Sequence, residues 1–142
     1  MQTISFETKI KYHQDGSTKS IERVDTITGI SIVETFYWGG GKLSYIETKD
    51  NRIILHKFFD RFGHIKKDTR FDGEKDIENI WYENGILEKR TEYVNGKRHG
   101  LEERFDEQGR LRRKACYFNG AIESYKEYGK DNNLLRQYKY FF

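Results

Sequence analysis

Polar and apolar side chains alternate along much of the chain, most clearly between Gly85 and Gly96. A period of two indicates a β-strand, because successive side chains of a strand point to opposite faces. The pattern predicts that Leu87, Lys89, Thr91 and Tyr93 share one face and that Glu88, Arg90 and Glu92 share the other.

Tight-turn signals interrupt the alternation at regular places. Asn95-Gly96 and Asn119-Gly120 supply the left-handed backbone that a two-residue turn needs. Asn84-Gly85 and Gln108-Gly109 are predicted to do the same at the opposite edge of the sheet. The chain has no proline, which suits a long run of paired strands because proline would remove a ladder donor.

These turns belong to a repeat with a period of 22 to 25 residues. Its turn positions are Gly16, Gly41, Gly63, Gly85 and Gly109, followed by Asn133. An aromatic residue stands four places before each turn glycine, at Tyr12, Tyr37, Phe59, Trp81 and Phe105, whereas the last repeat has Gly129 there, next to Tyr128. An aliphatic residue stands two places after, at Leu43, Ile65, Leu87, Leu111 and Leu135.

The repeat predicts an all-β fold, an elongated meander of about six repeated antiparallel hairpins in a single-layer twisted sheet. We expect one repeat domain over residues 1–142, with degenerate repeats in 1–56, regular repeats in 57–128 and a C-terminal capping repeat in 129–142. Five residues are predicted to lie on one face with their side chains largely buried: Leu87, Tyr93, Phe105, Leu111 and Tyr117.

The most regular part of the chain resembles the bacterial MORN-variant repeat. Tyr93–Leu101 reads YVNGKRHGL, Arg104–Leu111 reads RFDEQGRL and Tyr117–Gly120 reads YFNG, and the resemblance extends from about residue 57 to 128. It implies a ribbon of consecutive MORN-like hairpins. Bacterial proteins of this kind are often described as antitoxins of the YwqK type, so the resemblance also implies a toxin as partner.

Composition narrows the classes of partner. The 26 basic and 23 acidic side chains give a net charge of +3, which provides no general attraction to nucleic acid, and we expect no nucleic-acid partner. The amino terminus lacks the features of a secretory signal and no apolar run approaches membrane-spanning length. We therefore expect a soluble, cytoplasmic protein without a membrane partner.

No group of residues suggests catalysis, so the chain is predicted not to be an enzyme and to need no cofactor or metal. Cys116 is the single cysteine and is expected to pack in a strand. The histidines are scattered, about one per repeat, which favours surface or turn roles over a metal or base role: His13, His56, His64 and His99.

Two places break the repeat and are predicted to bind a partner. Trp38 is out of phase with the aromatic positions, beside Gly39–Gly41, and an exposed Trp is a good anchor. An acidic segment that begins at Asp68 precedes Trp81. It either imitates nucleic acid and occupies the basic cleft of a toxin nuclease, or forms a charged edge that keeps the sheet soluble. The predicted partner-binding residues are Trp38, Asp72, Glu74, Asp76, Glu78 and Tyr82.

A basic run, Arg110 to Lys114, is either a nucleic-acid patch or one side of cross-strand ion pairs, and we favour pairing with Glu102, Glu103 and Glu107. The sequence as a whole predicts a non-catalytic protein-binding repeat protein, an immunity or antitoxin protein that neutralises a cognate toxin by surface occlusion. The alternatives are a scaffold that self-associates through sheet edges, for example as a homodimer, and a module that binds anionic lipid surfaces.

Overall fold

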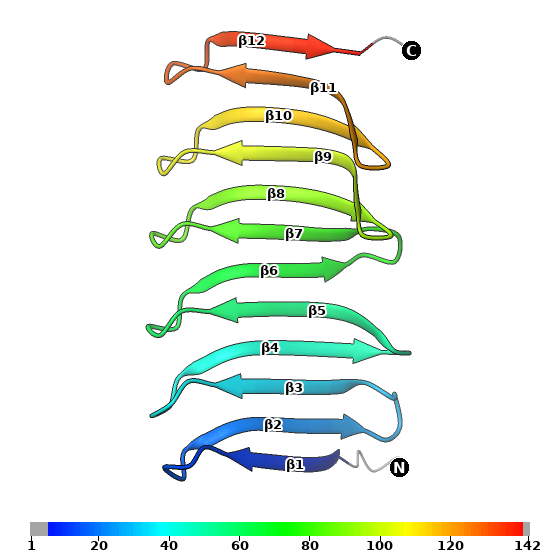
Figure 1. The fold of residues 1–142 in the computed structure, drawn as a ribbon, viewed down its shortest axis with the longest axis vertical. Helices are drawn as coiled ribbons and strands as arrows, with labels where there is room; N and C mark the ends of the chain where they lie inside the picture. Colours follow the sequence, from blue (N-terminus) through cyan, green and yellow to red (C-terminus); the bar gives the residue numbers. More distant parts are fainter. Residues whose placement is uncertain (1–5, 141–142) are drawn as a thin grey trace. The chain divides into compact units, whose positions relative to one another are not determined.

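The computed structural model describes residues 6–140 and confirms the all-β meander of antiparallel hairpins (Figure 1). The strands follow one another in chain order, each hydrogen-bonded to the next. They are β1 (Phe6–Tyr12), β2 (Thr18–Asp25), β3 (Ser31–Phe36), β4 (Lys42–Lys49), β5 (Arg52–Phe59), β6 (Ile65–Phe71), β7 (Asp76–Trp81), β8 (Leu87–Val94), β9 (Lys97–Phe105), β10 (Leu111–Phe118), β11 (Ala121–Tyr128) and β12 (Leu134–Lys139). No helix of a length and apolarity suited to crossing a membrane occurs among these residues.

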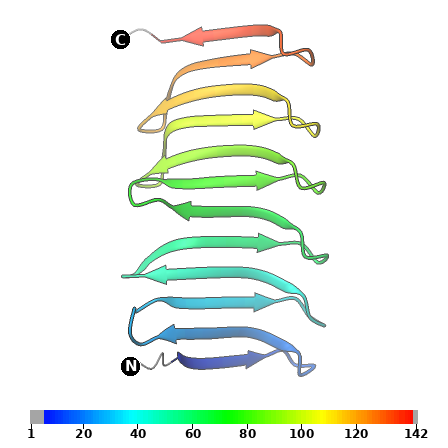
Figure 2. The same cartoon turned by 180° about the vertical axis from the view of Figure 1, so that it is seen from behind.

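The chain forms two compact bodies, which we call the N-terminal body (Met1–Thr69) and the C-terminal body (Arg70–Phe142). In the N-terminal body, one edge of the sheet carries the loops that close β1–β2, β3–β4 and β5–β6 (Figures 1 and 2). In the C-terminal body, one edge carries the loops that close β7–β8, β9–β10 and β11–β12. We call this edge of each body the loop edge.

All six of these loops have the same backbone hydrogen bonds. The N–H of the first loop residue donates to the carbonyl four residues later, and the N–H three residues later donates to the first residue's carbonyl, as Asp106, Gly109 and Arg110 do at 2.9 Å each. The residue three places after the first loop residue has a positive φ in every one of these loops: Gly16, Gly40, Gly63, Gly85, Gly109 and Asn132. The predicted positions Gly41 and Asn133 are therefore wrong by one residue, because the turn closes one place earlier in both loops.

The corrected positions make the aromatic rule complete. The residues four places before the loop positions are Tyr12, Phe36, Phe59, Trp81, Phe105 and Tyr128, and each of them is the last residue of its strand. The last repeat, which seemed to break the rule, obeys it through Tyr128. An aromatic ring thus ends every strand that enters the loop edge.

A β-bulge follows the β7–β8 loop and changes which face of the sheet each side chain occupies. Trp81 is paired with Leu87, whereas Ile80 is paired with Lys89, so the register shifts by one residue. Directly paired residues share a face, and Ile80 and Trp81 point to opposite faces. Leu87 is therefore opposite to Lys89 and Tyr93, and the predicted strict alternation is wrong at this point.

The same shift occurs between Leu111 and Arg113, so Leu87 and Leu111 still lie on the same face. That agreement supports the repeat. Tyr93 and Tyr117 lie on the other face, and the prediction of one common face for all five core residues is wrong because a single extra residue inverts the alternation.

Burial is smaller than the sequence predicted. Of the predicted core residues Tyr117 is buried, with Leu87, Tyr93, Phe105 and Leu111 half-buried. Strands contact their sequence neighbours within one sheet, so a side chain is covered mainly by residues on the same face. The fully covered residues lie in mid-strand and include two acids, Glu34 in the N-terminal body and Glu102 in the C-terminal body.

Half-burial lowers the expected effect of removing a repeat leucine. Leu111→Ala is expected to reduce the free energy of unfolding by about 1 to 2 kcal/mol, below the range typical of a fully buried leucine. Urea denaturation followed by circular dichroism would measure it. A loss above the range for a buried leucine would mean that a further layer covers this face in solution.

Candidate functional site: a cationic groove and an aromatic loop edge

Side chains at the loop edge join neighbouring repeats within each body. The phenol of Tyr37 donates to the carbonyl oxygen of Phe59, and that of Tyr82 donates to the carbonyl oxygen of Phe105, both at 2.8 Å. Tyr82 belongs to the predicted partner-binding set, and its half-buried hydroxyl is used in this contact. These bonds hold the loops at fixed positions relative to the next strand end.

Two strongly exposed aromatic rings lie inside the loops of the N-terminal body. Trp38 is 59% exposed and stacks on the His13 ring with centroids 4.7 Å apart, as expected for an exposed anchor. Phe62 is 87% exposed and lies 6.4 Å from the His64 ring. We call Trp38 and Phe62 the aromatic loop edge. Sequence reasoning missed Phe62, although a Phe inside a turn between Arg61 and Gly63 was a usable signal.

The predicted acidic residues do not form one patch. Asp72 accepts the backbone N–H groups of Glu74 at 2.9 Å and Lys75 at 2.7 Å, so its carboxylate closes the turn between β6 and β7. Glu74 is exposed in that turn. Asp76 and Glu78 are half-buried on one face of β7, beside Tyr93 and Thr91 of β8.

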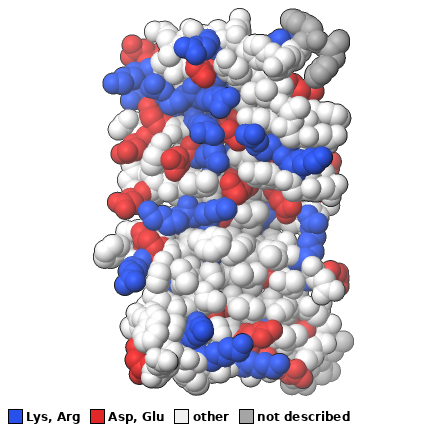
Figure 3. All heavy atoms as spheres, in the orientation of Figure 1, with Lys and Arg blue, Asp and Glu red and all other residues white. Residues whose placement is uncertain are grey.

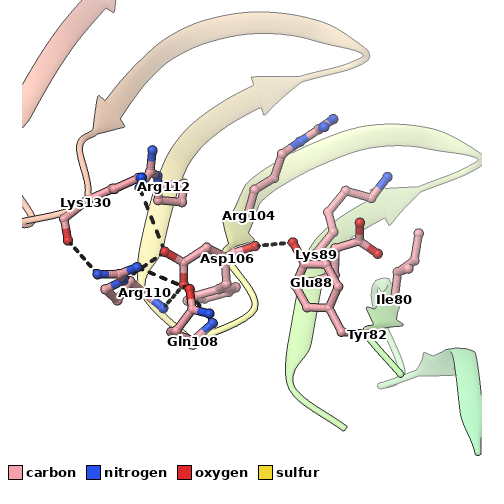
Figure 4. Close-up of a pocket in the computed structure, with 11 residues that line it drawn as sticks. Ile80, Tyr82, Glu88, Lys89, Arg104, Asp106, Gln108, Arg110, Arg112 and Lys130 are labelled. Atoms are coloured by element: carbon pink, nitrogen blue, oxygen red, sulfur yellow. Dashed lines mark hydrogen bonds and ion pairs between the residues drawn. The ribbon is translucent and has the colours of Figure 1, made fainter. Parts of the chain in front are cut away.

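A groove of about 560 Å³ opens at the loop edge of the C-terminal body (Figure 4). We call it the cationic groove, because its lining contains five cationic and two acidic side chains. Lys and Arg side chains gather over the loop ends of β10 and β11 in Figure 3. The lining residues are Ile80, Tyr82, Glu88, Lys89, Arg104, Phe105, Asp106, Gln108, Arg110, Arg112 and Lys130.

The strand register concentrates this charge. Lys89 is paired directly with Arg104, and Arg104 is paired directly with Arg113. Like charges opposite each other destabilise a sheet. The bulge beside Arg113 adds Arg112 to the same region. The direct pairing of these cations across three strands is unfavourable in itself, and the ion pair of Arg104 with Glu102 offsets part of the repulsion.

The basic run Arg110 to Lys114 is divided between faces. Lys114 is paired in register with Glu103, as the predicted cross-strand arrangement requires. Arg113 instead faces Arg104, and the prediction of acidic partners throughout the run is wrong at this position. The β-bulge is the reason, since it shifts the register by one residue between Leu111 and Arg113.

One wall of the groove is held rigidly by Asp106. Its Oδ1 accepts the N–H groups of Gln108 and Arg110 at 3.0 Å, and its Oδ2 lies 2.9 Å from Arg110 Nε. The Arg110 guanidinium also donates to the carbonyl oxygen of Lys130 at 3.1 Å, which links two loops. Desolvation acts to raise the pKa of Asp106, but the hydrogen bonds from Arg110 and Gln108, together with the charge of Arg110, outweigh it and the pKa is lowered.

A buried glutamate lies beside the groove. Glu102 is 2% exposed and accepts a hydrogen bond from the Thr91 hydroxyl at 3.2 Å. Two guanidinium groups neutralise it, Arg104 at 3.3 Å and Arg98 at 3.6 Å. Arg98 also lies over the Tyr117 ring at 4.2 Å. This network fixes the position of Arg104, which lines the groove.

The histidines have separate environments. Among residues 6–140, no group of three His, Cys, Asp or Glu side chains is placed to hold a metal ion. The Nε2 atom of His56 is buried without a hydrogen-bond partner, and burial, then the charge of Lys67, lowers the pKa of this ring. His64 lies 3.0 Å from the Asp60 carboxylate, and His99 packs 5.0 Å from the Phe118 ring.

The turn aspartates make the stability of the fold depend on pH. The pKa of Asp72 is lowered by the backbone N–H of Lys75 and then by that of Glu74. A lowered folded-state pKa stabilises the protein above the unfolded value, and this contribution is lost as pH falls through the folded value. Melting temperatures measured from pH 7 to pH 2.5 are expected to fall below about pH 4, and less steeply in Asp72→Asn. Equal slopes in both proteins would contradict this role of Asp72.

Comparison with known proteins leaves the family open. No family model matches the chain, and no curated protein matches it. Among solved structures, a crystal structure of TarM matches with a TM-score of 0.46 and 14% identity, over 65% of this chain and 18% of that chain. The chain therefore corresponds to less than a fifth of that protein's length.

Proposed function

We propose that this chain is a non-catalytic protein-binding repeat module, an immunity or antitoxin protein that neutralises a cognate toxin in the cytoplasm by covering its surface. The observation that carries the proposal is the aromatic loop edge. Trp38 and Phe62 leave most of their surface in water, at 59% and 87% exposure. Exposure of rings of this size to water is unfavourable in the free protein, and a partner that covers them gains the free energy of burying their apolar surface.

The loops that present these rings are held in place before a partner arrives. The His13 ring supports Trp38 and bonds through Nε2 to the Phe36 carbonyl at 3.1 Å. The Arg61 guanidinium, next to Phe62 in the chain, lies 5.3 Å from the centre of the Tyr37 ring. Anchors on such preorganised loops lose little conformational entropy on binding, and Trp is among the residues that most often dominate an interface.

The experiment is an affinity capture of the tagged chain from its native host, compared with Trp38→Ala/Phe62→Ala. One stoichiometric protein should be retained by the wild type and be lost from the variant, with affinity lowered at least about thirtyfold, as expected for hot-spot residues. Phe118→Ala is the matched control, because Phe118 is 55% exposed in the C-terminal body. Inhibition of the captured protein's own activity by the wild type would establish the antitoxin role.

A scaffold role is the second candidate, favoured by the open strand order. β1 and β12 are the first and last strands of the sheet, and terminal strands offer backbone groups for pairing with another chain. Capture of only a second copy of the chain, unchanged by Trp38→Ala/Phe62→Ala, would support this candidate and reject the antitoxin.

A further inference from the structure

The cationic groove has a charge excess that its own acids do not neutralise. Asp106 is bound to Arg110 and to two backbone N–H groups, so one of the two acids is already used. Among residues 6–140, the ammonium groups of Lys89 and Lys130 show no ion pair. Arg112 has a single long contact, 3.8 Å to Asp106. Arg104 is shared with Glu102 at 3.3 Å, so Lys89, Lys130 and Arg112 carry most of the charge excess that an anion from outside can neutralise.

These donors come from separate elements and line one hollow (Figure 4). Lys89 lies on β8, Arg104 on β9 and Arg112 on β10, and Lys130 lies in the β11–β12 loop. The side chains of Arg104 and Arg112 are 49% and 33% exposed, so both can be reached from solvent. Cationic groups from three strands and one loop could therefore contact the same anion, whereas an isolated surface ion pair offers only one.

The charge favours a dianion. A single carboxylate would leave most of the cationic excess in place, whereas a phosphomonoester carries nearly two negative charges at neutral pH and three acceptor oxygens. Arginine forks match phosphate geometry, and lysine adds a mobile point charge. Ile80, which is paired with Lys89, and the Tyr82 ring provide apolar surface in the same groove. The volume of about 560 Å³ falls in the range of small-molecule sites.

We propose that the cationic groove is a binding site for a soluble small molecule that carries a phosphomonoester, with the phosphate among Lys89, Arg104, Arg112 and Lys130 and the organic part on Ile80 and Tyr82. The site lies in the C-terminal body, and its occupancy does not depend on the aromatic loop edge. Both proposals can therefore fail separately.

The test uses three probes that share one base and ribose: AMP, cyclic AMP and adenosine. Calorimetry on the full chain at pH 7.5 and low salt should show AMP binding about tenfold or more tighter than cyclic AMP, because the diester carries one charge, and adenosine should bind weakest. Lowering the pH to 5 protonates the AMP monoester and should remove most of its advantage.

Variants then locate the site. Lys89→Gln/Lys130→Gln should weaken AMP binding about tenfold, and it should fold normally because neither ammonium group supports a structural contact. Lys114→Gln is the matched control, since Lys114 is an exposed lysine of β10 on the opposite face from Arg113. Its AMP affinity should stay within about twofold of wild type.

Three results would overturn the proposal. Equal affinity for AMP and cyclic AMP would remove the dianion argument. Unchanged AMP binding by Lys89→Gln/Lys130→Gln would place the ligand elsewhere. Competition by a pentaglutamate peptide at lower concentrations than AMP would assign the groove to protein carboxylates instead.

Discussion

Replacing Arg98 and Arg104 together by Gln is expected to lower the free energy of unfolding by about 3 to 5 kcal/mol, the largest effect predicted for this protein. The reason is the difference in burial within the network. Glu102 is 2% exposed, whereas the two arginine side chains are 40% and 49% exposed. Removal of the arginines leaves a carboxylate in a covered position with the Thr91 hydroxyl as its remaining partner.

Replacing the buried acid instead of its two arginine partners should destabilise the protein less. Glu102→Gln leaves Arg98 and Arg104 in contact with water, so we expect a loss of about 1 to 3 kcal/mol. Adding Glu102→Gln to the double arginine variant should recover part of its stability, because the unpaired charge is then gone. Urea unfolding would measure all three proteins.

The control for the arginine variant removes two cations from the other face. Lys114 and Lys126 are exposed and directly paired in the sheet. Lys114→Gln/Lys126→Gln is expected to leave stability unchanged or slightly raised, because it relieves a like-charge pair. If the arginine variant were as stable as this control, Glu102 would not depend on its two partners.

Gly100→Ala is the second large effect, with an expected loss of about 2 to 4 kcal/mol. Gly100 has a φ of +107°, which other residues rarely adopt. A Cβ atom there would also collide with the Glu92 carboxylate. That carboxylate accepts the N–H of Leu101 at 2.8 Å and lies 3.3 Å from Lys75 Nζ, so its displacement breaks two further contacts.

A double-mutant cycle separates backbone strain from the collision. In a Glu92→Ala background, Gly100→Ala should cost about 1 to 3 kcal/mol, the strain alone. Gly129→Ala is the control glycine, because Gly129 lacks a positive φ and its Cβ would meet the exposed, movable side chain of Leu135. It should change stability by less than about 1 kcal/mol. A Gly100→Ala protein as stable as this control would contradict the steric account.

Gly100 also shows how far a sequence motif can be interpreted. The stretch YVNGKRHGL places a glycine at position 100, but the sequence pattern contains no physical reason for it. The structure supplies that reason in the Glu92 carboxylate, which occupies the place of a side chain. The residue type was readable from sequence, and its cause was not.

The sequence by itself determined the features that depend on neighbours a few residues apart. Asn95 and Gly96 both adopt positive φ, as their dipeptide predicted, and so do Asn119 and Gly120. The alternation of polar and apolar residues predicted the strands, and the spacing of turns predicted the meander. Turn formation and strand pleat are local, so local composition was sufficient for the fold class.

The tertiary structure decided everything that depends on register between strands. One extra residue after the β7–β8 turn moved Leu87 to the face opposite Tyr93, and no period-two pattern can reveal such a bulge. Register also paired Lys89 with Arg104 and gathered cations from separate hairpins into one groove, although the chain as a whole is nearly neutral. Net charge sums over the sequence, whereas a binding site depends on which charges the folded backbone places within a few ångströms of each other.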